Sequence, residues 1–166
     1  FTGVNGSWWM VIDLQLEAPT GKPVTLGKTT FGMLGIRMSK TVSVREGGGR
    51  ILNSNGDLNE KGVFRKQARW VDYSGPVTRD ECGGITLMDH PQNPNHPAIF
   101  HVRDNGWLGV TLTPDAPRVI EPGKPLRLRY ALWVHNGVPG ALTVDQQWQT
   151  FSALALSELK NKHKPF

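Results

Sequence analysis

The strongest pattern along the chain is the alternation of apolar and polar residues in LRLRYALWVH, residues 126–135. Large apolar side chains, including Tyr130, fall on one side of this segment, and both of its arginines fall on the other. Residues 10–17 alternate in the same way. Because successive side chains of a β-strand point to opposite faces, the pattern predicts two half-buried strands.

Shorter alternating or apolar runs predict further strands. They cover residues 24–27, 31–38, 41–45, 65–73, 85–88, 98–102 and 107–113. Segments rich in glycine, proline and asparagine separate many of these runs, and such residues favour turns. Residues 8–17 and 24–27 are expected to form a hairpin or meander. Gly32 and Gly35 interrupt an apolar run, which indicates a close backbone approach or a bulge.

Only the C-terminal part of the chain has helical spacing. Its apolar residues, Trp148, Phe151 and Leu154 among them, predict an amphipathic helix over residues 144–160, followed by a tail over residues 161–166. With strands over residues 1–143, the chain is predicted to be all-β, an antiparallel β-sandwich with a short C-terminal helix. Residues 1–166 are expected to form a single domain or the C-terminal part of a larger one.

Composition and charge narrow the possible functions. The formal net charge is +5, but the basic residues are scattered along the chain apart from a C-terminal lysine cluster. Nucleic-acid binding needs a clustered basic face, so no nucleic-acid partner is expected. No apolar run approaches the roughly 20 residues of a membrane span, and no signal peptide is recognised in these residues. A single cysteine, Cys82, gives neither a disulfide framework nor a cysteine-based zinc site.

The most unusual segment is the histidine loop, residues 89–97, with the sequence DHPQNPNHP. It holds the candidate catalytic residues Asp89, His90 and His96. An imidazole can bind a metal, transfer a proton near neutral pH or hydrogen-bond a sugar. The same three residues are also weak candidates for a metal site, because two histidines and one carboxylate can hold Fe(II) or zinc. Their spacing matches no recognised ligand signature, so the histidines could instead cap carbonyls and rigidify the loop.

A second group of candidates lies on the predicted strand over residues 65–73. Arg69 and Tyr73 are expected on one face of this strand, and Trp70 and Asp72 on the other. Sugar sites combine an aromatic surface with paired polar groups, but an aromatic core residue beside a buried Arg–Asp pair would give the same sequence. The predicted substrate-binding residues are Arg69, Trp70, Asp72, Tyr73, Asn93 and Arg103.

The other histidines and the cysteine are weaker candidates for a functional role. His135 ends a predicted strand and is expected to be structural, whereas His101 and His163 are expected to be solvated or incidental. Cys82 has no neighbouring histidine or lysine in the sequence to activate its thiol, so nucleophilic catalysis is not expected.

Several motifs together resemble a known family. They are GRILNSNG at 49–56, KQARWVDYSG at 66–75, GGITLMDHPQNPNHP at 83–97, FHVR at 100–103 and LRLRYALWVHNG at 126–137. Over residues 8–137 the chain resembles the C-terminal half of bacterial proteins of the DUF6807 type, often labelled "methane oxygenase PmoA". Members of that type are nearly twice as long and carry a second motif resembling DHPHHRG. That motif is absent here, so the chain is expected to be a fragment or a truncated relative.

The resemblance implies a large sandwich similar to the galactose-mutarotase supersandwich. Related genes often lie beside carbohydrate-degrading genes, which implies a carbohydrate or another small-molecule ligand and a periplasmic or secreted location. The leading hypothesis is therefore a carbohydrate-active or carbohydrate-binding protein whose histidine loop and 69–73 strand line one cleft. In a catalytic version, His90 or His96 would move the proton while Arg69 and Asp72 orient the sugar.

Two other hypotheses stay open. One is a non-catalytic structural or interaction module, completed by a partner chain or a second copy that covers its sheet edges. The other is the metal-dependent oxygenase that the family label implies. No cofactor is expected apart from that possible metal.

Overall fold

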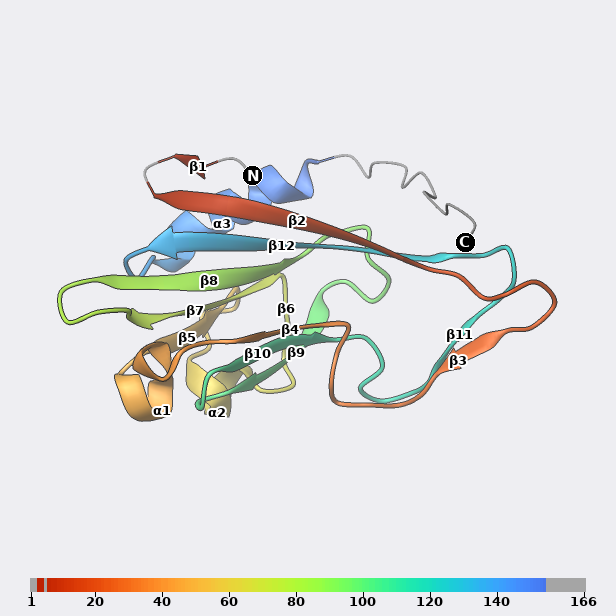
Figure 1. Ribbon diagram of the computed structural model, residues 1–166, viewed down its shortest axis with the longest axis horizontal. Coiled ribbons are helices and arrows are strands. Elements are labelled where there is room, and N and C mark those ends of the chain that lie inside the picture. Colours follow the sequence, from red (N-terminus) through yellow and green to blue (C-terminus); the bar gives the residue numbers. More distant parts are fainter. Residues whose placement is uncertain (1–2, 5, 155–166) are drawn as a thin grey trace, which may run out of the picture.

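The computed structural model describes residues 3–4 and 6–154, and it shows an antiparallel β-sandwich with a helix on one outer face (Figure 1). The expected fold class is confirmed. The larger sheet contains, in spatial order, β1 (Gly3–Val4), β2 (Ser7–Leu16), β12 (Leu126–Asn136), β8 (Cys82–Asp89), β7 (Trp70–Pro76) and β5 (Arg50–Asn53). The smaller sheet contains β4 (Leu34–Arg37), β10 (Trp107–Thr111), β9 (Ala98–Arg103) and β6 (Gln67–Ala68). A separate ribbon pairs β11 (Arg118–Ile120) with β3 (Val24–Leu26).

Two apolar cores hold these layers together. The first includes Val71 and Leu87 of the larger sheet and Phe100 and Leu108 of the smaller one, all fully buried. The second lies between the other face of the larger sheet and the helix α3 (Ala141–Ser152), on which Phe151 is fully buried. Both faces of the larger sheet are therefore covered by elements of this chain.

The helix begins earlier than the sequence predicted. Gly140 is extended, with ψ 163°, and its carbonyl accepts the first helical hydrogen bond from the amide of Val144. The helical residues consequently start at Ala141 rather than at 144, and they end at Ser152. Positions 155–160 of the predicted helix and the predicted tail lie outside the described residues. The described part of the chain has no helix long and apolar enough to span a membrane.

The predicted strand over residues 41–45 is wrong. The chain forms a 3₁₀ turn, η1 (Lys40–Val42), and a short helix, α1 (Val44–Gly47). The Ser43 hydroxyl accepts a hydrogen bond from the amide of Glu46, at 3.1 Å, and Gly48 ends the turn in the left-handed conformation at φ 75°. These caps stabilise a helical turn, and a short alternating run is too weak to oppose them. A second short helix, α2 (Asn59–Val63), was not predicted.

The expected hairpin between the first two strands is also wrong. β2 pairs along its length with β12, where Leu14 lies opposite Leu128, and β3 pairs with β11. The predicted strand over 65–73 is broken as well, because Arg69 lies between β6 in the smaller sheet and β7 in the larger one.

Gly32 marks a close backbone approach, as predicted, whereas Gly35 lies against the side chain of Trp107. A Cβ atom at Gly32 would lie 1.3 Å from the carbonyl oxygen of Val110. A Cβ atom at Gly35 would lie 2.6 Å from the ring of Trp107. Any side chain at either position would therefore push β4 or its entry loop away from β10.

Candidate functional site

The histidine loop connects β8 in the larger sheet to β9 in the smaller sheet, and Asp89 organises it. The Asp89 side chain is only 1% exposed. One of its oxygens accepts a hydrogen bond from the Asn93 amide at 2.7 Å, and the other accepts from the Ala98 backbone at 2.9 Å. The second oxygen also lies 2.6 Å from Nδ1 of His96. A single buried carboxylate thus ties the start, the middle and the end of the loop together.

Asn93 is part of this support rather than a ligand contact. Its side-chain nitrogen also donates to the carbonyl of Arg129 at 2.7 Å, and its side-chain oxygen accepts from the amide of Arg129 at 2.7 Å. Its amide therefore pairs with β12 as a neighbouring strand would. The substrate-binding role predicted for Asn93 finds no support, because the side chain is buried and its groups are used within the protein.

The side chain of His90 points towards α3. Its ring packs edge-on against Phe151, with 5.2 Å between the ring centroids. Nδ1 accepts a hydrogen bond from the amide of Gln92, so the proton is on Nε2, which donates to the carbonyl of Leu154 at 3.2 Å. Burial lowers the pKa of His90 and keeps the ring neutral. These contacts match the loop-stabilising alternative left open by the sequence.

His96 has a different environment. Its ring lies nearly parallel to that of Trp148 on α3, at 9° and 6.1 Å between centroids, and its side chain is 18% exposed. Since Nδ1 donates to Asp89, Nε2 is the acceptor nitrogen, and it has no hydrogen-bond partner among the described residues. The Arg69 guanidinium lies over the same indole, 4.9 Å from the ring centroid, and donates to Asp145 at 2.7 Å. His96 and Arg69 are thus brought together through Trp148, which the sequence did not predict.

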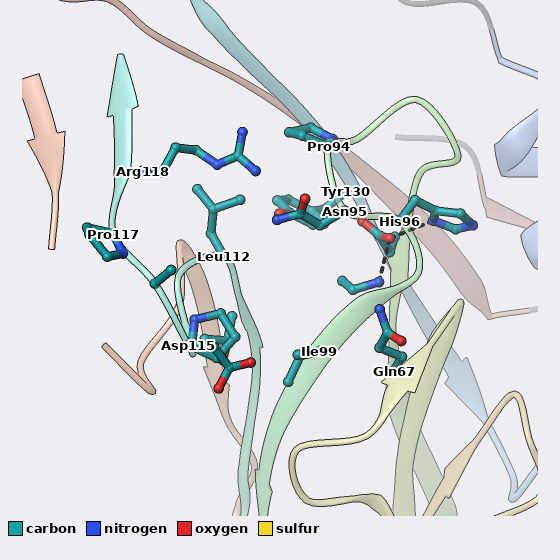
Figure 2. A pocket seen from close by; sticks show the side chains of 15 residues that line it. Gln67, Pro94, Asn95, His96, Ile99, Leu112, Asp115, Pro117, Arg118 and Tyr130 are labelled. Carbon is teal, nitrogen blue, oxygen red and sulfur yellow. Dashed lines mark hydrogen bonds and ion pairs between the residues drawn. The ribbon is translucent and has the colours of Figure 1, made fainter. Parts of the chain in front are cut away.

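A cavity of about 500 Å³ borders the histidine loop, and Asp89 and His96 are among the residues that line it (Figure 2). Asn95 and Pro94 of the loop form one wall, and the segment from Leu112 to Arg118, between β10 and β11, forms the facing wall. The Asp89 carboxylate lies at the edge of the cavity. The His96 ring lies beyond that carboxylate and points away from Leu112 (Figure 2).

Tyr130 supplies the most informative polar group of the cavity. Its ring belongs to the sandwich core and the residue is 2% exposed, yet its hydroxyl has no hydrogen-bond partner among the described residues. Burial and the nearby charge of Asp89 raise the pKa of Tyr130, so the hydroxyl stays protonated and can donate a hydrogen bond. Among the described residues this hydroxyl is not one of the fully buried polar atoms that lack a partner, so it is reached from the cavity and is available to a ligand.

Asn95 is the second unusual residue in the wall. Its backbone is in the left-handed region at φ 67°, which is uncommon outside glycine, although asparagine tolerates it best. The residue is exposed and borders the cavity. Such backbone strain is often found where a side chain is held in position for binding.

The structure does not place the 69–73 segment in this cavity. Trp70, Asp72 and Tyr73 are each 0% exposed, because β7 is an inner strand covered on both faces. The predicted faces are correct for these residues, since Trp70 faces α3 and Tyr73 faces the core between the sheets. The expected cleft shared with the histidine loop is wrong for all of them.

Their polar groups have structural partners instead. Trp70 donates to Asp145 at 2.7 Å, and Asp72 accepts hydrogen bonds from Thr86 at 2.8 Å and from Ser74 at 2.7 Å. The Tyr73 hydroxyl accepts from the amides of Val44 and Gly106, both at 3.1 Å. Arg69 was expected on the face of Tyr73, but it lies outside β7 and contacts α3.

Arg103 lies far from the loop. It ends β9, whereas the loop joins the start of that strand, so about 16 Å of extended chain separates Arg103 from Ala98 at about 3.3 Å per residue. Its guanidinium donates to Glu60 at 2.6 Å and covers the ring of Phe64, with 4.5 Å to the centroid. Arg103, which was predicted to bind the substrate, therefore lies away from the histidine loop.

His135 and His101 are both buried, and His163 lies outside the described residues. His135 lies 2.8 Å from Asp72, in line with its expected structural role. His101 was expected to be solvated or incidental. It is not solvated, because it packs against Phe31 and Phe64 and hydrogen-bonds the carbonyl of Thr30 at 2.9 Å. In the described part of the chain, no three His, Cys, Asp or Glu side chains are grouped so that they could hold a metal ion.

The comparison with protein families gives one result. A model described as a family of unknown function, DUF6807, matches residues 1–149. The chain belongs to the DUF6807 family. Comparisons with curated proteins and with solved structures gave no match. The DUF6807 match includes the histidine loop, the 112–118 segment and Tyr130, so every wall of the cavity lies within the family region.

Proposed function

We propose that this protein binds a carbohydrate in the cavity between the histidine loop and the 112–118 segment. The observation that carries the proposal is the Tyr130 hydroxyl, which borders the cavity and has no hydrogen-bond partner among the described residues. A sugar presents both hydroxyl groups and apolar C–H faces. The cavity offers both kinds of partner, with the side chains of Gln67 and Asn95 beside those of Leu112 and Pro94. Its volume of about 500 Å³ falls within the usual range for small-molecule sites.

The support of the loop favours binding as well. The hydrogen bonds to Asp89 hold the wall that contains Asn95 in place before any ligand arrives. A preorganised wall loses little conformational entropy on binding. Tyr130 is fixed by its place in the core and in the middle of β12.

The test is a titration of the purified protein with neutral and acidic mono- and disaccharides, followed by calorimetry and NMR. Tyr130→Phe removes the hydroxyl and keeps the ring, so we expect about fivefold weaker sugar binding, from one lost hydrogen bond. The chain's other tyrosine provides the control. Tyr73→Phe should lower stability and leave sugar affinity unchanged, because its hydroxyl is bonded within the protein. Equal affinity in wild type and Tyr130→Phe, or no binding by any sugar of the panel, would contradict the proposal.

A second candidate function is general acid/base chemistry at His96. The observation that favours it is the Asp89–His96 contact, which fixes the tautomer and leaves Nε2 as an acceptor. Because the ring points away from Leu112, the reacting group would lie on the Trp148 side of the loop. Anomer exchange and glycoside hydrolysis, followed by NMR, test this function. His96→Gln should abolish the rate enhancement; an unchanged rate would exclude His96 as the base.

A further inference from the structure

We propose that the ligand of the cavity is an anionic sugar, whose carboxylate or sulfate group binds Arg118. This inference rests on the proposed carbohydrate function and specifies its ligand class. It follows from the charges that border the cavity and from the hydrogen bonds that each of them already makes.

The negative charges at the cavity are already matched by protein groups. Asp89 accepts hydrogen bonds from Asn93, Ala98 and His96. Asp115, at the rim, pairs with Arg65 at 2.6 Å. Neither carboxylate therefore needs a cationic ligand.

The positive charge is not matched. Arg118 is half-buried at the cavity, and among the described residues its guanidinium has neither an ion pair nor a hydrogen bond. A guanidinium offers several N–H donors in a planar fork that fits a carboxylate or sulfate with two parallel hydrogen bonds. A neutral hydroxyl would use that fork less completely.

The position of Arg118 suits this role. It is the first residue of β11, and its backbone is fixed by pairing with Leu26 of β3. Figure 2 shows the guanidinium extending from β11 towards Pro94, on the side of the cavity where Tyr130 and Asn95 lie. The Arg118 guanidinium and the Tyr130 hydroxyl thus present donors to the same part of the cavity. The net charge of +5 also favours the approach of an anion.

Matched ligand pairs test the inference. Glucuronate is compared with glucose, galacturonate with galactose, and glucose 6-sulfate with glucose, by calorimetry at low and at physiological salt. We expect wild type to bind the acidic member about tenfold more tightly. Arg118→Gln should remove that preference and leave affinity for the neutral sugar within about twofold. A preference for the uronates identifies a carboxylate ligand, and a preference for the sulfate ester identifies a sulfated one.

The control is Arg127→Gln, which removes the same charge from an exposed arginine that hydrogen-bonds Gln15 on β2, outside the cavity. The Arg127→Gln variant should retain the preference for acidic sugars. This result would show that the preference comes from the Arg118 guanidinium and not from the net charge of the protein. Equal affinity for acidic and neutral sugars in wild type would overturn the anionic ligand and keep the carbohydrate function. An unchanged preference in Arg118→Gln would overturn the role of Arg118. No binding of any sugar would overturn both.

Discussion

At the scale of single residues, the histidine loop depends on the buried carboxylate of Asp89. Asp89→Ala would leave the Asn93 and His96 side chains and the Ala98 amide without their acceptor. We expect the free energy of unfolding to fall by about 3 kcal/mol, the range for a broken buried polar network. Urea denaturation measures the loss. Asp80→Ala, at an exposed turn position, should change it by less than about 0.5 kcal/mol, and equal effects would contradict the role of Asp89.

His90 predicts a pH dependence whose sign follows from its neutral state. Burial lowers the pKa of His90 in the folded protein. The charge of Arg129, and that of His96 when it is protonated, act in the same direction, while the hydrogen bond to the Leu154 carbonyl and the charge of Asp89 act against them. The unfolded chain takes up a proton near pH 6.5, and the folded protein resists it. The contribution of His90 to stability is therefore present above about pH 6.5 and is lost as the pH falls through its lowered pKa.

Unfolding of wild type and His90→Gln across pH 5–8 tests this prediction. Wild type should lose stability on acidification more steeply than the variant, in which the titrating ring is absent. An NMR titration of the His90 ring should give a pKa below the ordinary value for histidine. Parallel pH profiles of the two proteins would show that His90 is not the group responsible.

The residues that line the cavity were predicted from the sequence only in part. The composition of the histidine loop marked it as a site, but Asp89 and His90 turned out to support the loop from within. Tyr130 was placed on the apolar side of its strand, which is correct for its ring. Its hydroxyl was missed, because the cavity is completed by residues 112–118, which another strand brings to it. The nearest signal was the PDAPR segment at 114–118, in which an aspartate lies between two prolines and an arginine follows the second proline.

At the scale of elements, α3 is the cover of the larger sheet. Phe151 is fully buried there and packs against the rings of Trp9 and His90. Phe151→Ala should lower the free energy of unfolding by about 4 kcal/mol, because it leaves a large cavity at the centre of the contact. Leu142→Ala is the matched control on the same helix, where the side chain is 82% exposed, and it should change stability by less than about 0.5 kcal/mol. Similar losses in both variants, measured by urea denaturation, would contradict this packing.

Elements with a long, regular pattern were the predictable ones. β12 and β2 extend over eleven and ten residues, enough for alternation to be unambiguous. The 41–45 segment has only a short alternation, so the cap at Ser43 and the glycine at 48 determined its conformation instead. The break at Arg69 could not be predicted for a different reason. β6 joins the smaller sheet and β7 joins the larger sheet, and this pairing depends on strands that are distant in the sequence.

At the scale of the whole molecule, the order of strands determines which sheet faces and edges a partner could cover. The sandwich supplies its own second sheet, and α3 covers the remaining face of the larger sheet. The hypothesis of a partner that covers sheet edges now concerns β1 and β5 of the larger sheet and β4 and β6 of the smaller one. It stays a prediction, which sizing of the purified protein at several concentrations tests.

The same strand order predicts a single cooperative unit. β2 pairs with β12, near the other end of the described chain, and β8 leads through the histidine loop into β9 of the opposite sheet. Neither sheet can form from one contiguous half of the sequence. Loss of either sheet would also expose the core that contains Leu87 and Phe100. The two sheets are therefore expected to unfold together.

Native-state hydrogen exchange measures this cooperativity. The slowest amides of β9 and β10 should have the same opening free energy, and the same dependence on denaturant, as those of β8 and β12. Exchange in β9 and β10 at a clearly lower free energy would show that the smaller sheet opens alone. In Asp89→Ala the two sets should separate, because that variant loosens the loop joining β8 to β9. Such a separation would show that the hydrogen bonds of Asp89 make the two sheets unfold together.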